Sequence, residues 1–365
     1  MDKTINALGL MSGTSFDGID ASLISSDGEK NIKIVGNLYQ EYDSELKIKL
    51  YKFCNKIHSA ADLKANKSEF KHFERMITIK HSEISSKICK KFNFNPKIIG
   101  FHGQTILHKP EERLSVQMGN GRLLSQLLKK DVIYNFRKND LNFGGEGAPL
   151  TPIYHHNIKK KLNINYPIIF LNIGGIANYT FSKINTFTAR DVGPGNCLMD
   201  SYLKKNTKLT YDENGKIAAS GKIDFPLINN FFEHEIYNSK QKHSLDIKDF
   251  DINFVKGLSV QDAMACLNYF SAKIISENIK KNLKNNYDII LCGGGRKNKT
   301  LVKNLKKLLN NNIINIDSFK IDGDFIESQA FGYLGIRSFL KKNISFPNTT
   351  NVKKPISGGE LIKAI

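Results

Sequence analysis

Tryptophan is absent from this 365-residue chain, and proline and cysteine are scarce. The five cysteines are scattered, odd in number and contain no CxxC pair: Cys54, Cys89, Cys197, Cys266 and Cys292. That pattern argues against a disulfide framework or a zinc site and fits a reducing compartment. No run of 18 apolar residues occurs, and the first residues lack the long apolar core of a secretion signal. We therefore expect a cytoplasmic protein without a membrane span.

Arginine is also scarce, because it supplies only seven of the 54 basic residues in a chain of net charge +19. A strong positive charge can indicate nucleic-acid binding. Here, however, the lysines spread along the whole chain, and asparagine and isoleucine are abundant as well. This composition is typical of an AT-rich genome. It favours a solvated lysine-rich surface over a nucleic-acid partner, although a basic nucleic-acid binder stays an alternative.

The order of predicted elements indicates two similar halves. Residues 5–11, 19–25 and 32–40 are predicted strands, 44–57 and 68–92 are predicted helices, and further β/α units follow. A second strand–glycine turn–strand segment, "YPIIFLNIGGIANYTF", begins the same plan again at residue 166. We predict an α/β fold with two lobes, 1–138 and 139–345, a tail at 346–365 and a ligand-binding cleft between the lobes.

Each half carries a glycine-rich turn between its first two strands. These are Gly13-Thr14-Ser15 and Gly174-Gly175. Glycine lets backbone approach a ligand, and successive N–H groups form a concave anion site. Neither the Walker pattern GxxxxGK[ST] nor GxGxxG is present. Either turn alone could be an ordinary tight hairpin, but the matching pair favours phosphate binding.

A third glycine segment, "CGGGRKN", follows a predicted strand. Gly293, Gly294 and Gly295 would leave a floor without side chains for a nucleotide base and ribose, with Asn298 near the start of the next helix. The alternative is a loop that only needs positive φ angles.

The segment "RDVGPGN" places an acid where a strand turns sharply into a helix. An ionised Asp191 could accept a proton from a water or hydroxyl that attacks an electrophile. Phosphoryl transfer needs positioning, charge neutralisation and one such base. Asp191 could equally cap its own helix.

Several segments together resemble the ordered motifs of the bacterial anhydro-N-acetylmuramic acid kinases, from residue 8 to about 359. They are "GLMSGTSFDGID", "FHGQTILHKP", "GGEGAPLTP", "NIGGIANYT", "DVGPGNCLMD", "YDENGKIAASGK", "CGGGRKN", "IESQAFGYLG" and "FPNTTNVKKPISGG". The resemblance implies an actin-like ATPase and sugar-kinase fold with two ribonuclease-H-like lobes. It also implies a cytoplasmic homodimer that acts in cell-wall recycling.

The reaction that this resemblance implies combines hydrolysis with phosphorylation. The family converts 1,6-anhydro-N-acetylmuramic acid, ATP and water into N-acetylmuramic acid 6-phosphate and ADP. Mg²⁺ is expected with ATP. Two alternatives stay open: a kinase of this fold that acts on another amino sugar, and an actin-like or chaperone-like nucleotide switch.

Site residues follow from the motifs that match. The turn becomes the ATP phosphate loop: Gly13, Thr14, Ser15, Phe16, Asp17, Gly18, Ile19 and Asp20. Asp191 matches the base that activates water, and Glu327 matches an acid near the sugar and the water. His102 and Gln104 are candidate sugar contacts. The metal ligands stay unassigned, with Asp17 and Asp20 as candidates.

Four positions depart from the usual motifs of the family. They are Asn135, where the family has aspartate, Glu146, where it has glutamine, and Arg190 and Val192, where an aromatic and a threonine usually flank the catalytic aspartate. These departures concern sugar contacts and rate rather than the fold.

Overall fold

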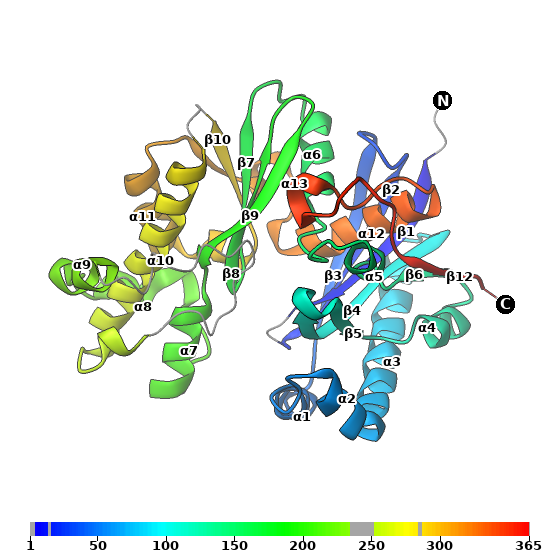
Figure 1. Ribbon diagram of the computed structural model, residues 1–365, viewed down its shortest axis with the longest axis horizontal. Helices are drawn as coiled ribbons and strands as arrows, with labels where there is room; N and C mark the ends of the chain where they lie inside the picture. Colours follow the sequence, from blue (N-terminus) through cyan, green and yellow to red (C-terminus); the bar gives the residue numbers. More distant parts are fainter. Residues whose placement is uncertain (1–3, 14–15, 234–251, 284–286, 365) are drawn as a thin grey trace. The chain divides into compact units, whose positions relative to one another are not determined.

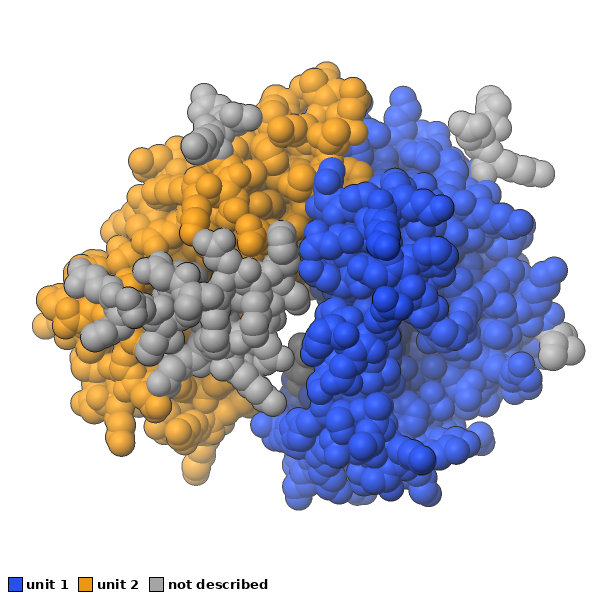
Figure 2. Space-filling view, viewed as in Figure 1, with its two compact units in different colours: residues 1–164, 325–365 blue, residues 165–324 orange. Residues whose placement is uncertain are grey.

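The computed structural model describes residues 4–13, 16–233, 252–283 and 287–364. The chain forms two compact units (Figure 2). Unit 1 comprises Met1–Ile164 and Phe325–Ile365, and unit 2 comprises Asn165–Asp324.

The seven-stranded sheet of unit 1 has the order β12-β6-β4-β1-β2-β3, with β5 paired to β4 (Figure 1). The first three strands form an antiparallel meander, and β4 and β6 then add in parallel to β1. The strands are β1 (Ile5–Ser12), β2 (Gly18–Ser26), β3 (Ile32–Glu41), β4 (Ile98–Lys109), β5 (Leu114–Met118), β6 (Asp131–Tyr134) and β12 (Glu360–Ile362).

Helices cover both faces of this sheet. Leu8 and Leu10 of β1 belong to the same apolar cluster as Ile77 and Ile84 of α3, whereas the intervening Gly9 lies against the backbone of α12. Strand alternation explains this division, because successive side chains point to opposite faces. The helices of unit 1 are α1 (Ser44–Cys54), α2 (Ala60–Ala65), α3 (Lys67–Lys91), α4 (Gly121–Leu128), α5 (Lys138–Asn142), α6 (Pro152–Lys161), α12 (Ile326–Phe339) and α13 (Pro347–Thr350).

The five-stranded sheet of unit 2 has the order β11-β10-β7-β8-β9. Its first three strands are again an antiparallel meander, and β10 and β11 again add in parallel to the first strand. The strands are β7 (Ile168–Ile173), β8 (Ile176–Ser182), β9 (Phe187–Pro194), β10 (Asp288–Cys292) and β11 (Ile313–Asn315).

The helices of unit 2 pack around an apolar core that includes Leu171 of β7 and Phe270 of α10. Two of these helices begin at side-chain caps, because Ser259 accepts from the backbone N–H of Asp262 and Asn298 accepts from that of Leu301. The helices are α7 (Cys197–Asn206), α8 (Lys216–Ser220), α9 (Phe225–Glu233), α10 (Val260–Asn282) and α11 (Lys299–Leu309).

The two sheets therefore share one topology. Across each sheet, the third, second and first strands of the meander are followed by two strands that run parallel to the first. The predicted α/β class with two similarly built halves is confirmed. Among the described helices, none is long and apolar enough to cross a membrane.

The compact units divide the chain at other points than the predicted lobe boundaries of 138/139 and 345/346. Residues 139–164 and 325–345 fall in unit 1. The reason for the second segment is packing, since glycines of α12 approach glycines of β1 and β4: the Gly332 backbone lies against Gly9, and Gly335 lies against Gly100. Strand β5 had no counterpart in the sequence prediction, which assigned no strand to Leu114–Met118.

Candidate active site

Hydrogen bonds and an ion pair hold Gly13 and Asp17 at the two ends of the β1–β2 turn of unit 1. The carbonyl oxygen of Gly13 accepts hydrogen bonds from the Phe16 N–H at 3.2 Å and from the Gln104 Nε2 at 2.8 Å. Asp17 forms an ion pair with Lys47, and its carbonyl accepts from the Tyr42 N–H. Thr14 and Ser15 lie outside the described residues, so their predicted phosphate contacts stay predictions.

A buried chain of hydrogen bonds supports the end of β1, next to this turn. Ser12 Oγ lies 2.9 Å from the Tyr42 hydroxyl and 3.2 Å from His81 Nε2, and His81 Nδ1 lies 2.8 Å from the Ile77 carbonyl. A carbonyl only accepts, so His81 carries its proton on Nδ1. Its Nε2 then accepts from Ser12, which accepts from Tyr42. Burial lowers the pKa of His81 to about 4, so the ring is neutral at pH 7.

An irregularity in β4 determines where His102 and Gln104 lie. On β1, Leu10 and Ser12 face Phe101 and Gln104, so β4 contains one extra residue in the ladder. Gly103 has a φ of +74°, and a Cβ there would lie 2.5 Å from the Met118 carbonyl oxygen. Only glycine fits this bend, which turns Gln104 toward the β1–β2 turn.

His102 is held by Arg137, a residue that the sequence analysis did not assign to the site. His102 Nδ1 lies 3.0 Å from the Gly103 carbonyl, and Nε2 lies 3.0 Å from an Arg137 terminal nitrogen. His102 therefore donates from Nδ1 and accepts from Arg137. Burial, and then the Arg137 charge, hold the pKa of His102 well below its usual value. The imidazole is neutral, and its ring also packs on Phe331 of α12.

Glu327 lies in the first turn of α12, in the electrostatic field of Arg137. Burial raises the pKa of Glu327, and the Arg137 guanidinium opposes that rise. Within the described residues no hydrogen bond reaches this carboxylate. Burial also lowers the pKa of Arg137 to about 10, and its NH1 donates to the Gly147 carbonyl at 2.9 Å. Unit 1 therefore brings His102, Arg137 and Glu327 into one cluster.

Two of the predicted glycine segments meet in unit 2. Parallel strands β7 and β10 are paired up to Asn172 and Cys292, so Gly174 and Gly293 follow at the same edge of the sheet. The carboxyl ends of parallel strands are the usual ligand-binding edge of α/β sheets. The β7–β8 turn is also hydrogen-bonded to the β9–α7 turn. The Gly174 carbonyl accepts from the Asn196 N–H at 2.9 Å, and the Gly175 carbonyl accepts from the Gly195 N–H at 2.8 Å.

Not every glycine at this edge is required by the fold. A Cβ on Gly295 would lie 2.2 Å from Ile173 Cγ2, and Gly293 has a φ of +76°. In contrast, a Cβ on Gly294 would meet nothing within 4 Å, and at Gly174 and Gly175 the nearest atoms are 3.6 and 3.9 Å away. None of these three has a positive φ. Neither packing nor backbone strain therefore explains glycine at these three positions.

The side chain of Asn298 forms hydrogen bonds within the protein. Its Oδ1 accepts from the Leu301 N–H at 3.0 Å and from the Asn268 amide at 3.2 Å, and the residue is buried. Its position therefore fixes the start of α11 directly after the glycine segment. Arg296 stabilises the same loop, since its NH1 donates to the Gly293 carbonyl at 3.1 Å.

Asp191 lies within β9, three residues before the strand ends at Pro194 rather than at its last residue. It is half-buried and pairs with Asn178 of β8. Ala177 pairs with Gly193, so Val192 is the extra residue of a bulge between the two pairs. A bulge redirects the neighbouring side chains and is frequent next to active sites.

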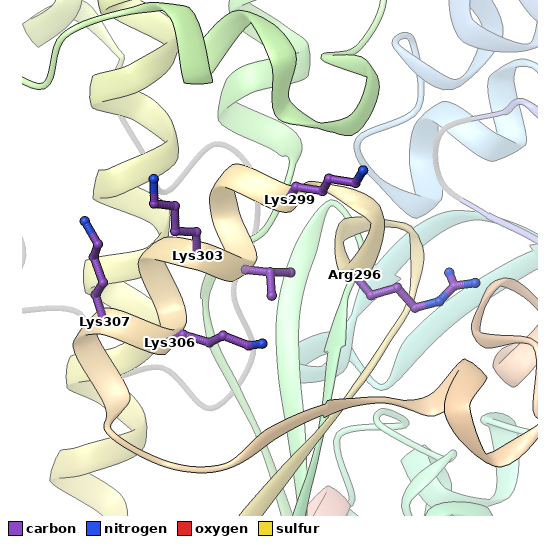
Figure 3. A pocket seen from close by; sticks show the side chains of 6 residues that line it. Arg296, Lys299, Lys303, Lys306 and Lys307 are labelled. Carbon is purple, nitrogen blue, oxygen red and sulfur yellow. The ribbon is translucent and has the colours of Figure 1, made fainter.

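A cavity of about 430 Å³ lies along α11 (Figure 3). Its lining is basic apart from Val302 and comprises Arg296, Lys299, Val302, Lys303, Lys306 and Lys307. Arg296 already contacts carboxylates, Asp317 and Asp324 among them. None of the predicted nucleotide residues lines this cavity, although Arg296, which does, donates to the Gly293 carbonyl.

The four positions that depart from the family motifs are engaged within the protein. Asn135 donates to Glu360 at 2.9 Å, and Glu146 accepts from Asn351 at 2.6 Å, so both contact the C-terminal tail. Arg190 donates to the Asn282 side chain at 2.8 Å on α10, and Val192 is fully buried in the core of unit 2.

Both α/β units have the same order of meander and parallel strands, and each has a glycine turn after its first strand. The profile of one family, described as anhydro-N-acetylmuramic acid kinase, matches residues 5–364. An anhydro-N-acetylmuramic acid kinase from Pelagibacter ubique is 49% identical over 373 residues, which cover all of both chains. One from Zymomonas mobilis is 37% identical and covers 97% of this chain and 99% of its own. The chain belongs to the anhydro-N-acetylmuramic acid kinase family and is a sugar kinase.

Proposed function

We propose that this chain converts 1,6-anhydro-N-acetylmuramic acid, ATP and water into N-acetylmuramic acid 6-phosphate and ADP, as a step of peptidoglycan recycling. Water adds to the anomeric carbon, the bond from that carbon to oxygen six breaks, and oxygen six takes the γ-phosphoryl group. Family membership over residues 5–364 carries this proposal.

ATP is bound by glycine turns in this proposal. Gly174, Gly175 and Gly294 support it most directly, because each is a glycine that the fold itself does not require. Gly293 and Gly295 shape the same edge, and Asn298 acts through the start of α11. The β1–β2 turn from Gly13 to Asp20 contacts the phosphates.

Asp191 is the general base that takes the proton of the attacking water. Its half-buried place beside a bulge and just before the β9–α7 turn supports this role. Such a base contributes on the order of 10²–10⁴-fold to a rate.

The cluster of His102, Arg137 and Glu327 binds the sugar. The Arg137 guanidinium and the Glu327 carboxylate, whose pKa is raised, offer a donor and a proton acceptor to hydroxyl groups, and the neutral His102 imidazole holds Arg137 in place. Arg137 is added to the residues assigned from the sequence, because it contacts His102 and lies in the field of Glu327.

Mg²⁺ accompanies ATP in this proposal. The described residues contain no group of three or more His, Cys, Asp or Glu side chains that could ligate a metal, and Asp17 is already paired with Lys47. These residues fit an ion that is held mainly by phosphate oxygens and by one or two carboxylates. Asp17 and Asp20 are the side chains next to the turn that could contribute.

We further propose a cytoplasmic homodimer. All five cysteines are among the described residues and form no disulfide, as expected for a reducing compartment. Sedimentation of the purified chain tests the dimer, because a species of 41.2 kDa at micromolar concentration would contradict it.

Incubation of the purified chain with ATP and the anhydro sugar in H₂¹⁸O tests the reaction. We expect ADP and a sugar phosphate that carries ¹⁸O on the anomeric carbon and none in the phosphate. Asp191→Asn should bind ATP with unchanged affinity and lose at least about 100-fold in rate. The absence of any phosphorylated muramic acid with the wild-type chain would refute the assignment, and ATP turnover without sugar would favour a nucleotide switch.

A further inference from the structure

We propose that Gln104 is a positioning residue that fixes the β1–β2 turn and thereby sets the affinity for the nucleotide. This inference rests on the proposed function, in which that turn contacts the ATP phosphates. It gives Gln104 a different role from the sugar contact that its motif predicts.

The contacts of Gln104 are with the turn. Its Nε2 donates to the Gly13 carbonyl at 2.8 Å, and the same oxygen accepts from the Phe16 N–H that closes the turn. Gln104 has no exposed surface, and its Oε1 is buried. A ligand therefore experiences Gln104 through the turn and not by direct contact.

The orientation of the amide follows from its partners. Gly13 and Thr105 both offer carbonyl oxygens to one end of the Gln104 side chain, at 2.8 and 3.4 Å, so that end is the donor Nε2. Among the residues that the structure describes, none is a hydrogen-bond partner of the Oε1 end. A buried acceptor without a partner destabilises a fold, so the donor end is what makes glutamine useful at this position.

The hydrogen bond controls which groups of the turn face a ligand. With the Gly13 carbonyl held toward Gln104, the negative end of that peptide dipole points into unit 1. A phosphate chain binds to backbone N–H groups and is repelled by carbonyl oxygens. Loss of the bond would let the carbonyl rotate and weaken phosphate binding.

Two irregular features of β4 make the contact between Gln104 and the Gly13 carbonyl possible. The extra residue between Phe101 and Gln104 and the left-handed Gly103 bring the Gln104 side chain beneath the turn. Ser12, which pairs with Gln104 across the ladder, is held by Tyr42 and His81. The turn is therefore fixed on both of its sides.

Gln104→Met tests the donor, since methionine keeps the length of the side chain and removes its hydrogen bonds. We expect the dissociation constant for ADP, measured by titration calorimetry, and the KM for ATP to rise about fivefold to tenfold, the effect of one lost hydrogen bond. The KM for the sugar should stay unchanged. Gln117→Met on the adjacent β5 is the matched control, because Gln117 bonds to Ser115 and not to the turn; its constants should equal those of the wild type.

Gln104→Glu provides a readout that general damage to the fold would not produce. A buried carboxyl has a raised pKa, and its protonated form can donate O–H to Gly13 as glutamine does. We expect weak ADP binding at pH 8 that recovers toward pH 6, with no such recovery in Gln104→Met. The nearby histidines, His81 and His102, are neutral over this range because burial lowers both pKa values.

Unchanged ADP affinity in Gln104→Met, or a rise in the sugar KM alone, would overturn the positioning role while the proposed function stands. A wild-type chain that binds no nucleotide and forms no product would instead overturn the proposed function.

Discussion

Acid should destabilise unit 1 through His81, the buried ring beneath the β1–β2 turn. Burial lowers its pKa from 6.5 to about 4 in the folded state. The unfolded chain therefore binds a proton more readily, so the contribution of His81 to stability is present above pH 6.5 and is lost as the pH falls toward 4. Between pH 6.5 and pH 5 the loss is about 1.5 × 1.36, or about 2 kcal/mol.

The structure also predicts what protonation breaks. The neutral ring donates from Nδ1 to the Ile77 carbonyl and accepts at Nε2 from Ser12. A second proton on Nε2 would turn this acceptor into a donor, reverse the Ser12–Tyr42 hydrogen bond and leave the Tyr42 proton without its acceptor. In the folded protein this second proton is taken up only around the folded-state pKa of about 4, so weaker nucleotide binding should appear at lower pH than the first loss of stability.

Urea unfolding at pH 7 and pH 5, followed by far-ultraviolet circular dichroism, measures the effect. We expect the wild type to lose about 2 kcal/mol more between the two pH values than His81→Gln, in which this position cannot titrate. His72→Gln is the matched control, because His72 is exposed on the same helix α3 and should keep the wild-type pH dependence. Equal pH dependence of His81→Gln and the wild type would refute the reasoning.

Two further predictions concern glycine and the C-terminal tail. Gly294→Ala should leave the melting temperature unchanged but weaken ATP binding. Gly295→Ala should instead cost about 1–3 kcal/mol of stability, because its Cβ would lie 2.2 Å from a side-chain carbon. A clear loss of stability in Gly294→Ala would contradict the idea that only a ligand needs that glycine. Asn135→Asp would place a carboxylate against Glu360 and lose about 1–2 kcal/mol at pH 7, and Glu360→Gln should restore most of it in a double-mutant cycle measured by urea unfolding. Additive effects of the two changes would show that the pair does not interact.

The Asn135–Glu360 contact also gives a reason for one departure from the family motif. Burial raises the pKa of Glu360, but hydrogen bonds from Lys138 and Asn135 bring it below its usual value, so Glu360 is ionised at pH 7. An aspartate at position 135 would meet that charge, whereas the asparagine amide donates to it. The departure therefore reflects a contact with this chain's own tail.

Local patterns in the sequence were enough to predict the strands of the first meander, the helix around residues 68–92 and the glycine turns. Strand alternation, helical spacing and glycine are properties of neighbouring residues, and they do not depend on the rest of the chain. Strand β5 was missed because Leu114–Met118 is short and is stabilised by antiparallel pairing with β4, in a ladder whose register shifts between Thr105 and Leu107.

The family motifs in the sequence determined the kind of reaction and located Asp191, Glu327 and the glycine segments. Only the tertiary structure decided which glycines the fold needs and which it does not, because the space around Gly294 and Gly295 differs although the residues are adjacent. It also decided that Arg137 joins His102 and Glu327, and that Gln104 holds the turn. These outcomes depend on contacts between segments far apart in the chain, and no local pattern encodes the burial, charge and hydrogen bonding that such contacts create.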